Sequence, residues 1–411
     1  MDERFRRIPP SRRNRPDLFL LGATVLLVIL GIAAMASISD ARVAMGREPG
    51  AILGKHLTRL GLGILLCIAG ALIPVNAWQH YAKGFLLAAL ALLLFSVLPR
   101  FGLGIEGVHV ARNGAYRWIH MGSLSLMPGE LFKVALVMWL SHFLSLTRIR
   151  PERLKDLLYP VILCGTAVLF FILQPALSTA AGVISVAAAM LYLAGGPTPR
   201  LRVLACGGVA VVGSLMLLSA SSSSLATHAP EASETTGLGV IRASEESPPL
   251  LTYVRGRLRE YVFPWKWSPR RLCYHARQSL IALGFGGLTG QGLGNGRHSY
   301  GRLPESHTDY PLAAIGEELG LLGTTVVVVA WSVIFLRGMR IARNAAHLYS
   351  FLLAAGLTLN LALFAVANAA VVTALVPVTG QGMPLVSYGG VGTAVNLFSI
   401  GVIDAVNRSK T

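Results

Sequence analysis

The chain has 411 residues, of which 54% are hydrophobic and only 13% charged, and its mean hydropathy is +0.60. This composition excludes a soluble globular domain and indicates a protein with many membrane-spanning segments. The formal net charge of +17 would suit a nucleic-acid-binding protein, but most basic residues lie in short segments between apolar runs, as in membrane proteins. Nucleic acid is therefore not an expected partner.

Apolar segments of roughly 20 residues, long enough to cross a hydrocarbon core, follow one another along the chain. We expect about ten spans, which begin near Leu18, Ala51, Gly84, Leu126, Leu157, Thr179, Leu201, Leu312, Phe351 and Leu385. The first is expected to be retained, because the run from Leu18 to Met35 is long for a signal peptide and lacks a convincing cleavage site. The predicted fold class is an all-α polytopic membrane protein.

Basic residues in the short connections predict the orientation. They are Arg4, Arg6, Arg7, Arg12, Arg13, Arg15, Arg148, Arg150, Arg153, Lys155, Arg200, Arg202, Arg337, Arg340, Arg343, Arg408 and Lys410. The positive-inside rule places these residues, the basic tail 1–17 and both termini in the cytoplasm. Residues 221–308 then form a large external loop between the seventh and eighth spans of a single membrane domain, 1–411.

The large loop has two parts of different composition. Residues 219–249 are rich in Ser, Ala, Thr and Glu, which predicts a flexible, low-complexity insert. Residues 253–303 combine aromatic and basic side chains, which favours a re-entrant element at headgroup level. The four cysteines, Cys67, Cys164, Cys206 and Cys273, imply neither a disulfide framework nor a metal site. The glycine run 284–294 lacks the Lys-Ser/Thr of a phosphate loop, so a nucleotide site is not expected.

The segment Leu303-Pro-Glu-Ser-His-Thr-Asp-Tyr310 places ionisable side chains where a polar loop meets an apolar run. Such groups are costly to keep at a membrane span unless they bind or react with something, so Asp309 is the first candidate for chemistry. A structural alternative is that Glu305 and His307 form a solvated cluster and that Thr308 and Asp309 cap the helix that starts near Pro311.

Other polar residues near span ends have two interpretations. Glu130 and Lys133 are three residues apart on a predicted helix, so they either pair to hold two spans together or contact a substrate. Glu317 and Glu318 are expected to make helix-to-helix hydrogen bonds that support the site. Ser387 either lies in a close helix contact made by the glycines that follow it or, with the loop of Thr379 and Gln381, lines the mouth of a cavity.

Several blocks of the sequence occur in the order that characterises one family of membrane proteins. They are Gly114-Ala-Tyr-Arg-Trp-Ile119, Met127-Pro-Gly-Glu-Leu-Phe-Lys133, Gln174-Pro175, Gln278-Ser-Leu-Ile-Ala282, Gly290-Gln-Gly-Leu-Gly-Asn295, Leu303 to Asp309, Ile315-Gly-Glu-Glu-Leu-Gly320, Pro377-Val-Thr-Gly380 and Pro384-Leu-Val-Ser-Tyr-Gly-Gly390. Across most of its length the chain resembles the SEDS (shape, elongation, division and sporulation) family of FtsW, RodA and SpoVE, and it is closer to FtsW and SpoVE.

The resemblance implies a peptidoglycan glycosyltransferase that polymerises lipid II at the outer face of the bacterial cytoplasmic membrane, in cell division or cell-shape maintenance. It implies Asp309 as general base and cations, Arg117 and Lys133, opposite the pyrophosphate leaving group. Further candidate substrate-binding residues are Glu130, Glu305, His307, Thr379 and Ser387. A divalent cation, Mg²⁺ or Mn²⁺, is a candidate at the pyrophosphate. Expected partners are lipid II, undecaprenyl-pyrophosphate-linked glycan, a class B penicillin-binding protein and other division or elongation membrane proteins.

The sequence departs from the family pattern after Gln174-Pro175, where Ala176 and Ser178 replace the usual Asp and Gly. Loss of that carboxylate favours a second hypothesis, a degenerate scaffold that recruits or activates a penicillin-binding protein. A third hypothesis, a transporter of lipid-linked precursors, would call for paired broken helices and mid-membrane ionisable residues, and inverted repeats are not apparent.

Overall fold

The computed structural model describes residues 15–44, 51–105, 108–109, 116–121, 124–146, 154–174, 176–195, 274–296, 298, 303, 305–377, 380–388 and 390–409. The span predicted near Leu201, the flexible insert 219–249 and most of the predicted re-entrant element lie outside these residues. Both predictions about the large loop therefore stay predictions, and so does the count of about ten spans.

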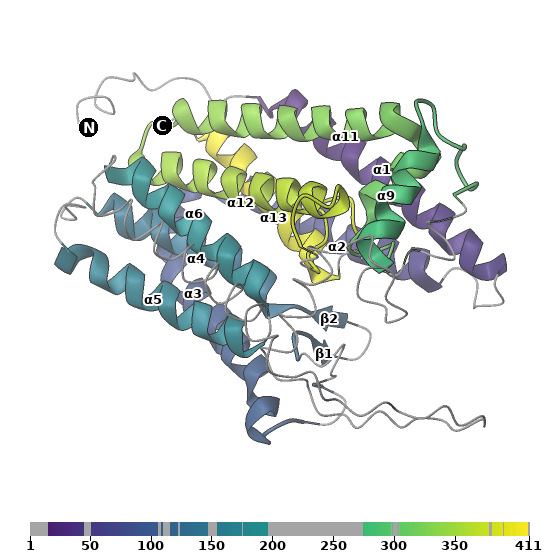
Figure 1. Ribbon diagram of the computed structural model, residues 1–411. Coiled ribbons are helices and arrows are strands. Elements are labelled where there is room, and N and C mark those ends of the chain that lie inside the picture. The colour runs from purple at the N-terminus through teal and green to yellow at the C-terminus, as the bar shows by residue number, and fades with distance from the viewer. Residues whose placement is uncertain are drawn as a thin grey trace.

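The described part of the chain is almost entirely helical (Figure 1), as the composition predicted. The helices are α1 (Leu18–Ala44), α2 (Ala51–Leu72), α3 (Val75–Val97), the 3₁₀ helix η2 (Leu98–Phe101), α4 (Pro128–Ser145), α5 (Leu154–Leu173), α6 (Leu177–Gly195), α9 (Tyr274–Gly286), α11 (Pro311–Arg343), α12 (Leu348–Val372) and α13 (Val391–Arg408). A short antiparallel hairpin of β1 (Ile119–Met121) and β2 (Leu124–Leu126) pairs Ile119 with Leu126 and precedes α4.

Among the described helices, 6 are long and apolar enough to cross a membrane. They give the spans Leu18–Ser39, Leu53–Leu72, Val75–Phe101, Leu177–Gly195, Pro311–Arg343 and Leu348–Val372, and α5 adds a shorter apolar helix, Leu158–Leu173. Helices α4 and α13, which carry ionisable residues, lie between other helices of the bundle: α4 packs on α3, α12 and α6, and α13 on α2, α12 and α11. The prediction of a polytopic all-α fold is confirmed.

Two predicted helix starts are wrong. Helix α3 begins at Val75 rather than near Gly84. Pro74 has a backbone conformation that favours a helix start after it, but the polar side chains of the first turns lower the hydropathy there, so the hydropathy pattern places the start too late. Helix α13 begins at Val391 rather than near Leu385. Leu385 and Val386 are buried, but Leu385 has φ 65°, so this apolar stretch is a buried loop.

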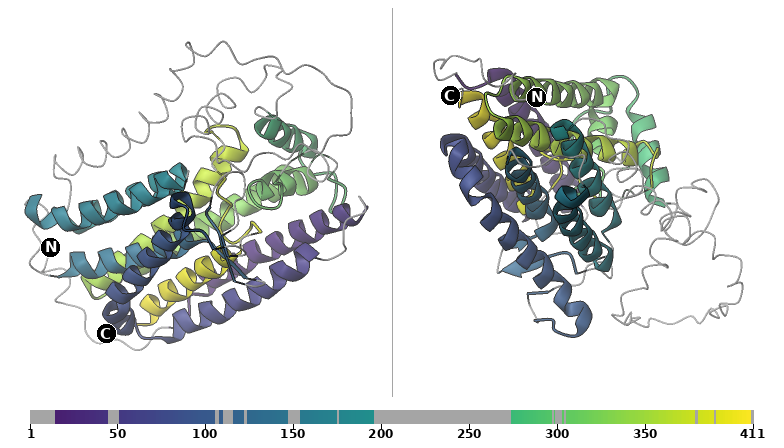
Figure 2. Two further views of the ribbon diagram at one scale, coloured as in Figure 1. Left: turned by 90° about the horizontal axis from the view of Figure 1, so that it is seen from below. Right: turned by 90° about the vertical axis from the view of Figure 1, so that its left-hand side faces the viewer.

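Close helix packing builds the bundle. Helix α13 lies along α2 (Figure 2), and glycines on both helices face the contact. A Cβ at Gly401 would overlap the Cys67 backbone, and one at Gly70 would lie 2.9 Å from the Phe398 carbonyl oxygen. Small residues are what allow helices to approach this closely in a membrane.

Helix α11 is broken at Gly320, which has φ 66° and ψ −159°. The loop after α9 pairs with the break: the backbone N–H groups of Gln291 and Gly292 donate to the Glu317 and Glu318 carbonyls at 2.9 and 3.0 Å, and Leu321 N–H donates to the Gly287 carbonyl at 2.9 Å. These bonds satisfy backbone groups that a helix break would otherwise leave unpaired in an apolar setting.

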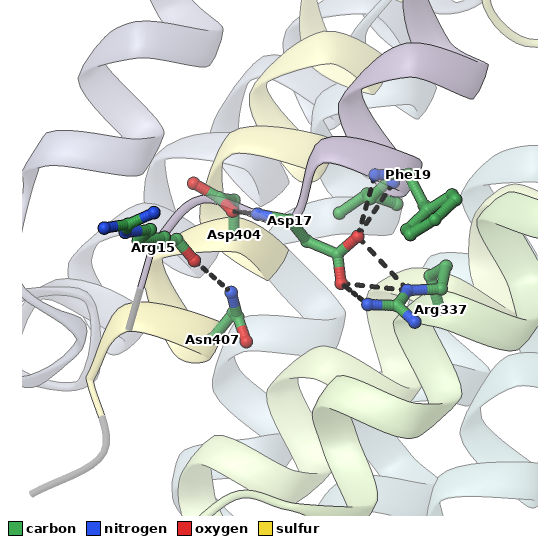
Figure 3. Close-up of polar contacts among 7 residues, drawn as sticks. Arg15, Asp17, Phe19, Arg337, Asp404 and Asn407 are labelled. Carbon is green, nitrogen blue, oxygen red and sulfur yellow. Dashed lines mark hydrogen bonds and ion pairs between the residues drawn. The ribbon is translucent and has the colours of Figure 1, made fainter. Parts of the chain in front are cut away.

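A network of charged groups joins α1, α11 and α13 at one end of the bundle (Figure 3). Arg337 on α11 donates to both carboxylate oxygens of Asp17. Its Nη2 lies 2.6 Å from Oδ2, and its Nε lies 3.0 Å from Oδ2 and 3.1 Å from Oδ1. The Asp17 N–H donates to Asp404 on α13 at 3.0 Å, and Asp404 also pairs with Arg408 at 2.8 Å. The start of α1 and the ends of α11 and α13 therefore lie at the same end of the molecule.

Candidate active site

A cavity of about 90 Å³ lies at the other end of the bundle, where α4, α11 and α13 begin. Its lining comes from the start of α4, the turn before α11, the loop 380–390 and the start of α13, and it includes Asp309, Glu130, Lys133, Gln381, Ser387 and Asn396. The structure thus brings four of the predicted site residues, Asp309, Glu130, Lys133 and Ser387, to one cavity.

Asp309 sits at the end of a tight turn. The N–H groups of Thr308 and Asp309 both donate to the Glu305 carbonyl, at 3.1 and 3.0 Å, and Glu305 takes up φ 51°, a conformation that few non-glycine residues adopt. The Thr308 hydroxyl donates to the Glu305 carboxylate at 2.9 Å. Tyr310 occupies the N-cap position of α11 without a side-chain capping bond, so the predicted cap formed by Thr308 and Asp309 is not what starts this helix.

A chain of buried amides fixes the backbone around Asp309. Asn368 on α12 donates from Nδ2 to the Asp309 carbonyl at 2.8 Å and to the Gln381 carbonyl at 2.9 Å. Gln381 in turn donates from Nε2 to the Thr179 hydroxyl on α6 at 2.7 Å. Asn368 and Thr179 are fully buried, where unpaired polar groups are costly. This network therefore holds the turn before α11 and the loop 380–390 in a fixed relation.

Glu130 and Lys133 form an ion pair of 2.7 Å in the first turns of α4, and both line the cavity. Lys133 is 5% exposed, and its Nζ lies 3.6 Å from the ring centroid of Phe364 on α12. The structure thus supports both interpretations of the pair: it joins α4 to α12 through a cation–π contact, and it presents a buried positive charge to the cavity.

Arg117 and Asp309 both lie next to Gly380. A Cβ on Gly380 would lie 3.7 Å from Nη1 of Arg117 and 3.8 Å from Oδ2 of Asp309, so the guanidinium and the candidate base are both close to one point beside this glycine. Arg117 Nε donates to the Gln174 carbonyl at 3.1 Å, and Gln174 donates to the Ser96 hydroxyl at 2.6 Å. The Gln174 block is therefore linked to the site through Arg117.

The remaining predicted residues have different positions. Glu305 and His307 are not among the cavity lining: their side chains are 4.0 Å apart, and the His307 ring packs on Tyr388 at 5.5 Å between centroids. Ser387 lines the cavity, and its buried hydroxyl has no hydrogen-bond partner among the described residues. Thr379 lies outside the described residues.

Predicted supporting contacts are found for the two glutamates of α11. Glu318 accepts a hydrogen bond of 2.6 Å from the Ser37 hydroxyl on α1, which confirms the expected helix-to-helix bond. Glu317 instead accepts one of 2.8 Å from the His298 backbone N–H, so the partner seen for it is in the loop before α11. Neither glutamate lines the cavity.

Sequence reasoning missed a set of residues from α2. The Arg59 guanidinium lies 5.1 Å from the ring centroid of Tyr388, which lines the cavity, and donates to the Ser125 hydroxyl on β2 at 3.3 Å. His56 is buried and its ring lies 6.0 Å from that of Tyr388. The signal was present, because two ionisable residues three apart within an apolar span lie on one helix face and mark a functional site.

The bundle and its cavity define a polytopic membrane protein with an acid, an ion pair and a guanidinium gathered at one end. The chain belongs to the FtsW/RodA/SpoVE family, described as "Cell cycle protein", whose family model matches residues 17–411.

Relatives of the chain extend over nearly its whole length. It is 29% identical over 400 residues to stage V sporulation protein E of Bacillus subtilis, covering 97% of this chain and 98% of that protein. It is 32% identical over 395 residues to a probable peptidoglycan glycosyltransferase FtsW of Coxiella burnetii, covering 94% of this chain and 95% of that protein.

Solved structures share the fold at lower identity. A chain from a structure on the coordination of polymerization and crosslinking by a peptidoglycan synthase complex has a TM-score of 0.71 at 23% identity, covering 96% of this chain and 98% of that chain. The rod shape determining protein RodA of Thermus thermophilus has a TM-score of 0.63 at 22% identity, covering 96% of this chain and 97% of that one. These two comparisons show a common fold.

Proposed function

We propose that this protein is a peptidoglycan glycosyltransferase that polymerises lipid II at the outer face of the cytoplasmic membrane, with Asp309 as general base. The observation that carries the proposal is that Asp309, the Glu130–Lys133 pair and Arg117, which lies beside Gly380 as Asp309 does, come together at one end of the bundle. Relatives named as probable peptidoglycan glycosyltransferases support it.

The geometry suits transfer of a sugar from a pyrophosphate carrier. The 4-hydroxyl of the acceptor sugar attacks the anomeric carbon of the donor, its proton passes to the Asp309 carboxylate, and the bond from that carbon to the pyrophosphate oxygen breaks. General-base assistance of this kind contributes roughly 10²- to 10⁴-fold. Lys133, which is buried, and Arg117 supply positive charge for the pyrophosphate that leaves.

The cavity of about 90 Å³ is far smaller than a disaccharide with its lipid. It therefore holds the reacting groups, while the polyprenyl chains of donor and acceptor remain in the bilayer and enter between helices. Ser387 and Asn396 add polar groups to its wall. Ser387 can donate to a sugar or phosphate oxygen without breaking a bond to a described residue.

A divalent cation fits the chemistry in one way only. Among the described residues, no group of three or more His, Cys, Asp or Glu side chains is placed to hold a metal. We therefore propose that any Mg²⁺ or Mn²⁺ would arrive with the pyrophosphate, as Mg²⁺ commonly does, and that Asp309 or Glu130 in the cavity wall would supply a carboxylate ligand. Dependence of polymerisation on added Mg²⁺ or Mn²⁺ after chelation tests this.

The basic residues and the comparisons support proposals for the orientation of the protein in the membrane and for its protein partner. Arg337, Arg340, Arg343 and Arg408 lie toward the end opposite the cavity, so the positive-inside rule places that end and both termini in the cytoplasm. A class B penicillin-binding protein is the proposed partner, because a neighbouring fold comes from a peptidoglycan synthase complex that couples polymerization to crosslinking.

The test is glycan-chain formation from lipid II by the purified protein with its penicillin-binding partner, whose catalytic serine is replaced. Wild type should form polymer and Asp309→Ala should form none, with Lys83→Met, an exposed position on α3, as a matched control that keeps activity. Polymer from Asp309→Ala at the wild-type rate would rule out the proposed base.

The degenerate-scaffold hypothesis is tested in the same assay. Ala176 is 2% exposed and packs in the apolar core, two residues after Gln174, whose carbonyl binds Arg117. Wild-type activity would show that an apolar residue is tolerated there. No polymer from wild type, with activity gained by Ala176→Asp, would favour the scaffold instead.

A further inference from the structure

A second cavity, of about 340 Å³, lies at the end of the bundle opposite Asp309. Its walls are the link between α2 and α3, the start of α12 and the end of α13. We propose that this cavity binds the phosphate group of an anionic ligand on the cytoplasmic side of the membrane. Its described lining contains no Asp or Glu, and its polar members are Asn76, His347, Ser350, Arg408 and Ser409.

Ser350 is the polar group that points to a ligand. It lines the cavity and is only 6% exposed, yet its hydroxyl has no hydrogen-bond partner among the described residues. Ser350 is in the first turn of α12, so no carbonyl of the same helix lies four residues before it to accept from its hydroxyl. A ligand or water in the cavity can therefore accept from this hydroxyl without displacing a bond to a described residue.

Two long helices begin at the cavity. Helix α3 starts at Val75 and α12 at Leu348, and neither Pro74 nor His347 at the N-cap position supplies a side-chain cap. The first-turn N–H groups of such helices have no intrahelical acceptor and carry partial positive charge. Together with Ser350 they offer several donors to one anion, which is the arrangement that favours phosphate.

Arg408 adds a formal positive charge to the same wall. Its Nη2 pairs with Asp404 at 2.8 Å, but its Nε has no partner among the described residues. Asp404 is itself shared, because its other oxygen accepts the Asp17 N–H. Helices α2 and α13 also end at this cavity. Some of their last carbonyls already accept hydrogen bonds from nearby N–H groups: the Ala69 carbonyl from Ile73, and the Ala405 carbonyl from Ser409.

The cavity lies at the depth of lipid headgroups, because three candidate spans end or begin at its lining residues Leu72, Val75 and the neighbouring Leu348. Leu72 is 66% exposed, so an apolar surface adjoins the polar wall. The shared chemistry is a phosphate oxyanion, whose source is either an anionic phospholipid headgroup or a soluble phosphate compound. Both would be drawn to this wall by the same donors.

The experiment uses the full chain purified in detergent, with two probes. Inorganic phosphate is titrated at constant ionic strength against chloride while the thermal unfolding midpoint is followed. Separately, native mass spectrometry counts phosphatidylglycerol retained relative to phosphatidylcholine. The variants are Ser350→Asp, which puts a carboxylate in the cavity, and Ser350→Ala. Asn344→Asp is the matched control, because Asn344 is exposed at the same end of the bundle and does not line the cavity.

Wild type and Asn344→Asp should bind at least one probe. Ser350→Asp should lose that binding, and Ser350→Ala should weaken it by roughly tenfold, the effect expected for a hydrogen bond to a charged group. A response to phosphatidylglycerol alone assigns the site to lipid, and a response to inorganic phosphate assigns it to a soluble anion. Binding of neither probe by wild type, or unchanged binding in both Ser350 variants, would overturn the proposal. No lipid II is present, so the result does not depend on the proposed polymerase activity.

Discussion

The two ends of the bundle both contain buried charged groups, and they use them in different ways. At one end, Arg337 donates to both oxygens of Asp17, and the backbone N–H groups of Phe19 and Leu20 donate to Asp17 Oδ1 as well. These groups join three helices, and Arg408, which lines the cavity at this end, is paired with Asp404 of the same network. At the other end, Asp309 and Lys133 lie in the wall of a cavity. We therefore assign Asp17 and Arg337 to holding helices together, and Asp309 and Lys133 to the candidate site.

Replacing each carboxylate by a carboxamide should give the largest difference between the two ends. Asp309→Asn should lower the rate of glycan polymerisation by roughly 10²- to 10⁴-fold, because the amide cannot take the proton, while the thermal unfolding midpoint stays near that of wild type. Asp17→Asn should instead lower the free energy of unfolding by about 2 kcal/mol, the scale of hydrogen bonds to a charged group, with little change in the rate per folded molecule. Polymerisation assays and thermal unfolding in the same detergent measure both quantities.

The opposite pattern would refute the assignment of the two ends. If Asp17→Asn stopped catalysis without loss of stability, or Asp309→Asn unfolded the protein while its folded fraction remained active, the roles given to the two carboxylates would be wrong. Asp17→Glu at one end and Asp309→Glu at the other test how closely each carboxylate must be placed.

The Glu130–Lys133 pair provides a smaller effect within the active end. Lys133→Met keeps the side-chain length but removes the charge, and should slow polymerisation by roughly tenfold or more. The effect should stay below the roughly 10²- to 10³-fold loss seen when a direct transition-state donor is removed, because Glu130 already neutralises part of the Lys133 charge. Initial rates at saturating lipid II measure it. Glu130→Gln leaves Lys133 cationic and should cost less.

The double variant distinguishes a pair from two independent residues. If Glu130 acts through Lys133, the combined substitution Glu130→Gln with Lys133→Met should be no slower than Lys133→Met alone. Fully additive losses would show that Glu130 contacts the substrate itself.

Local patterns in the sequence predicted the parts of the site that local patterns can encode. Asp309 beside an apolar run and the i, i+3 spacing of Glu130 and Lys133 each left a structural and a functional interpretation open, and the family resemblance favoured the functional one for Asp309; the structure brings all three residues to one cavity. The expected bond from Glu318 to another helix is also found, with Ser37 as donor.

What the sequence could not predict is which spans touch. Apolar helices look alike in hydropathy, so the pairings of Asp17 with Arg337 and of Asn368 with Asp309 depend on helix arrangement, which small residues such as Gly401 determine. The break at Gly320 could not be predicted for a related reason. The backbone groups at the break are hydrogen-bonded by the loop 287–292, which is distant in sequence, so the break needs no proline or polar run that would be visible in the sequence.

The mildest test concerns pH at the end held by Asp17. Burial alone would raise the pKa of Asp17, but hydrogen bonds from Arg337, Leu20 and Phe19 and the charge of Arg337 outweigh it, so the pKa lies below its ordinary value. The stability that Asp17 contributes is therefore fully present above its unfolded pKa of about 3.9 and is lost as the pH falls through the lower folded value. Between about pH 5 and pH 3 the unfolding midpoint of wild type should fall more than that of Asp17→Asn, which has no charge to lose there. Parallel acid profiles for the two proteins would show that Asp17 is not held ionised by Arg337, and the network would then be a set of neutral hydrogen bonds.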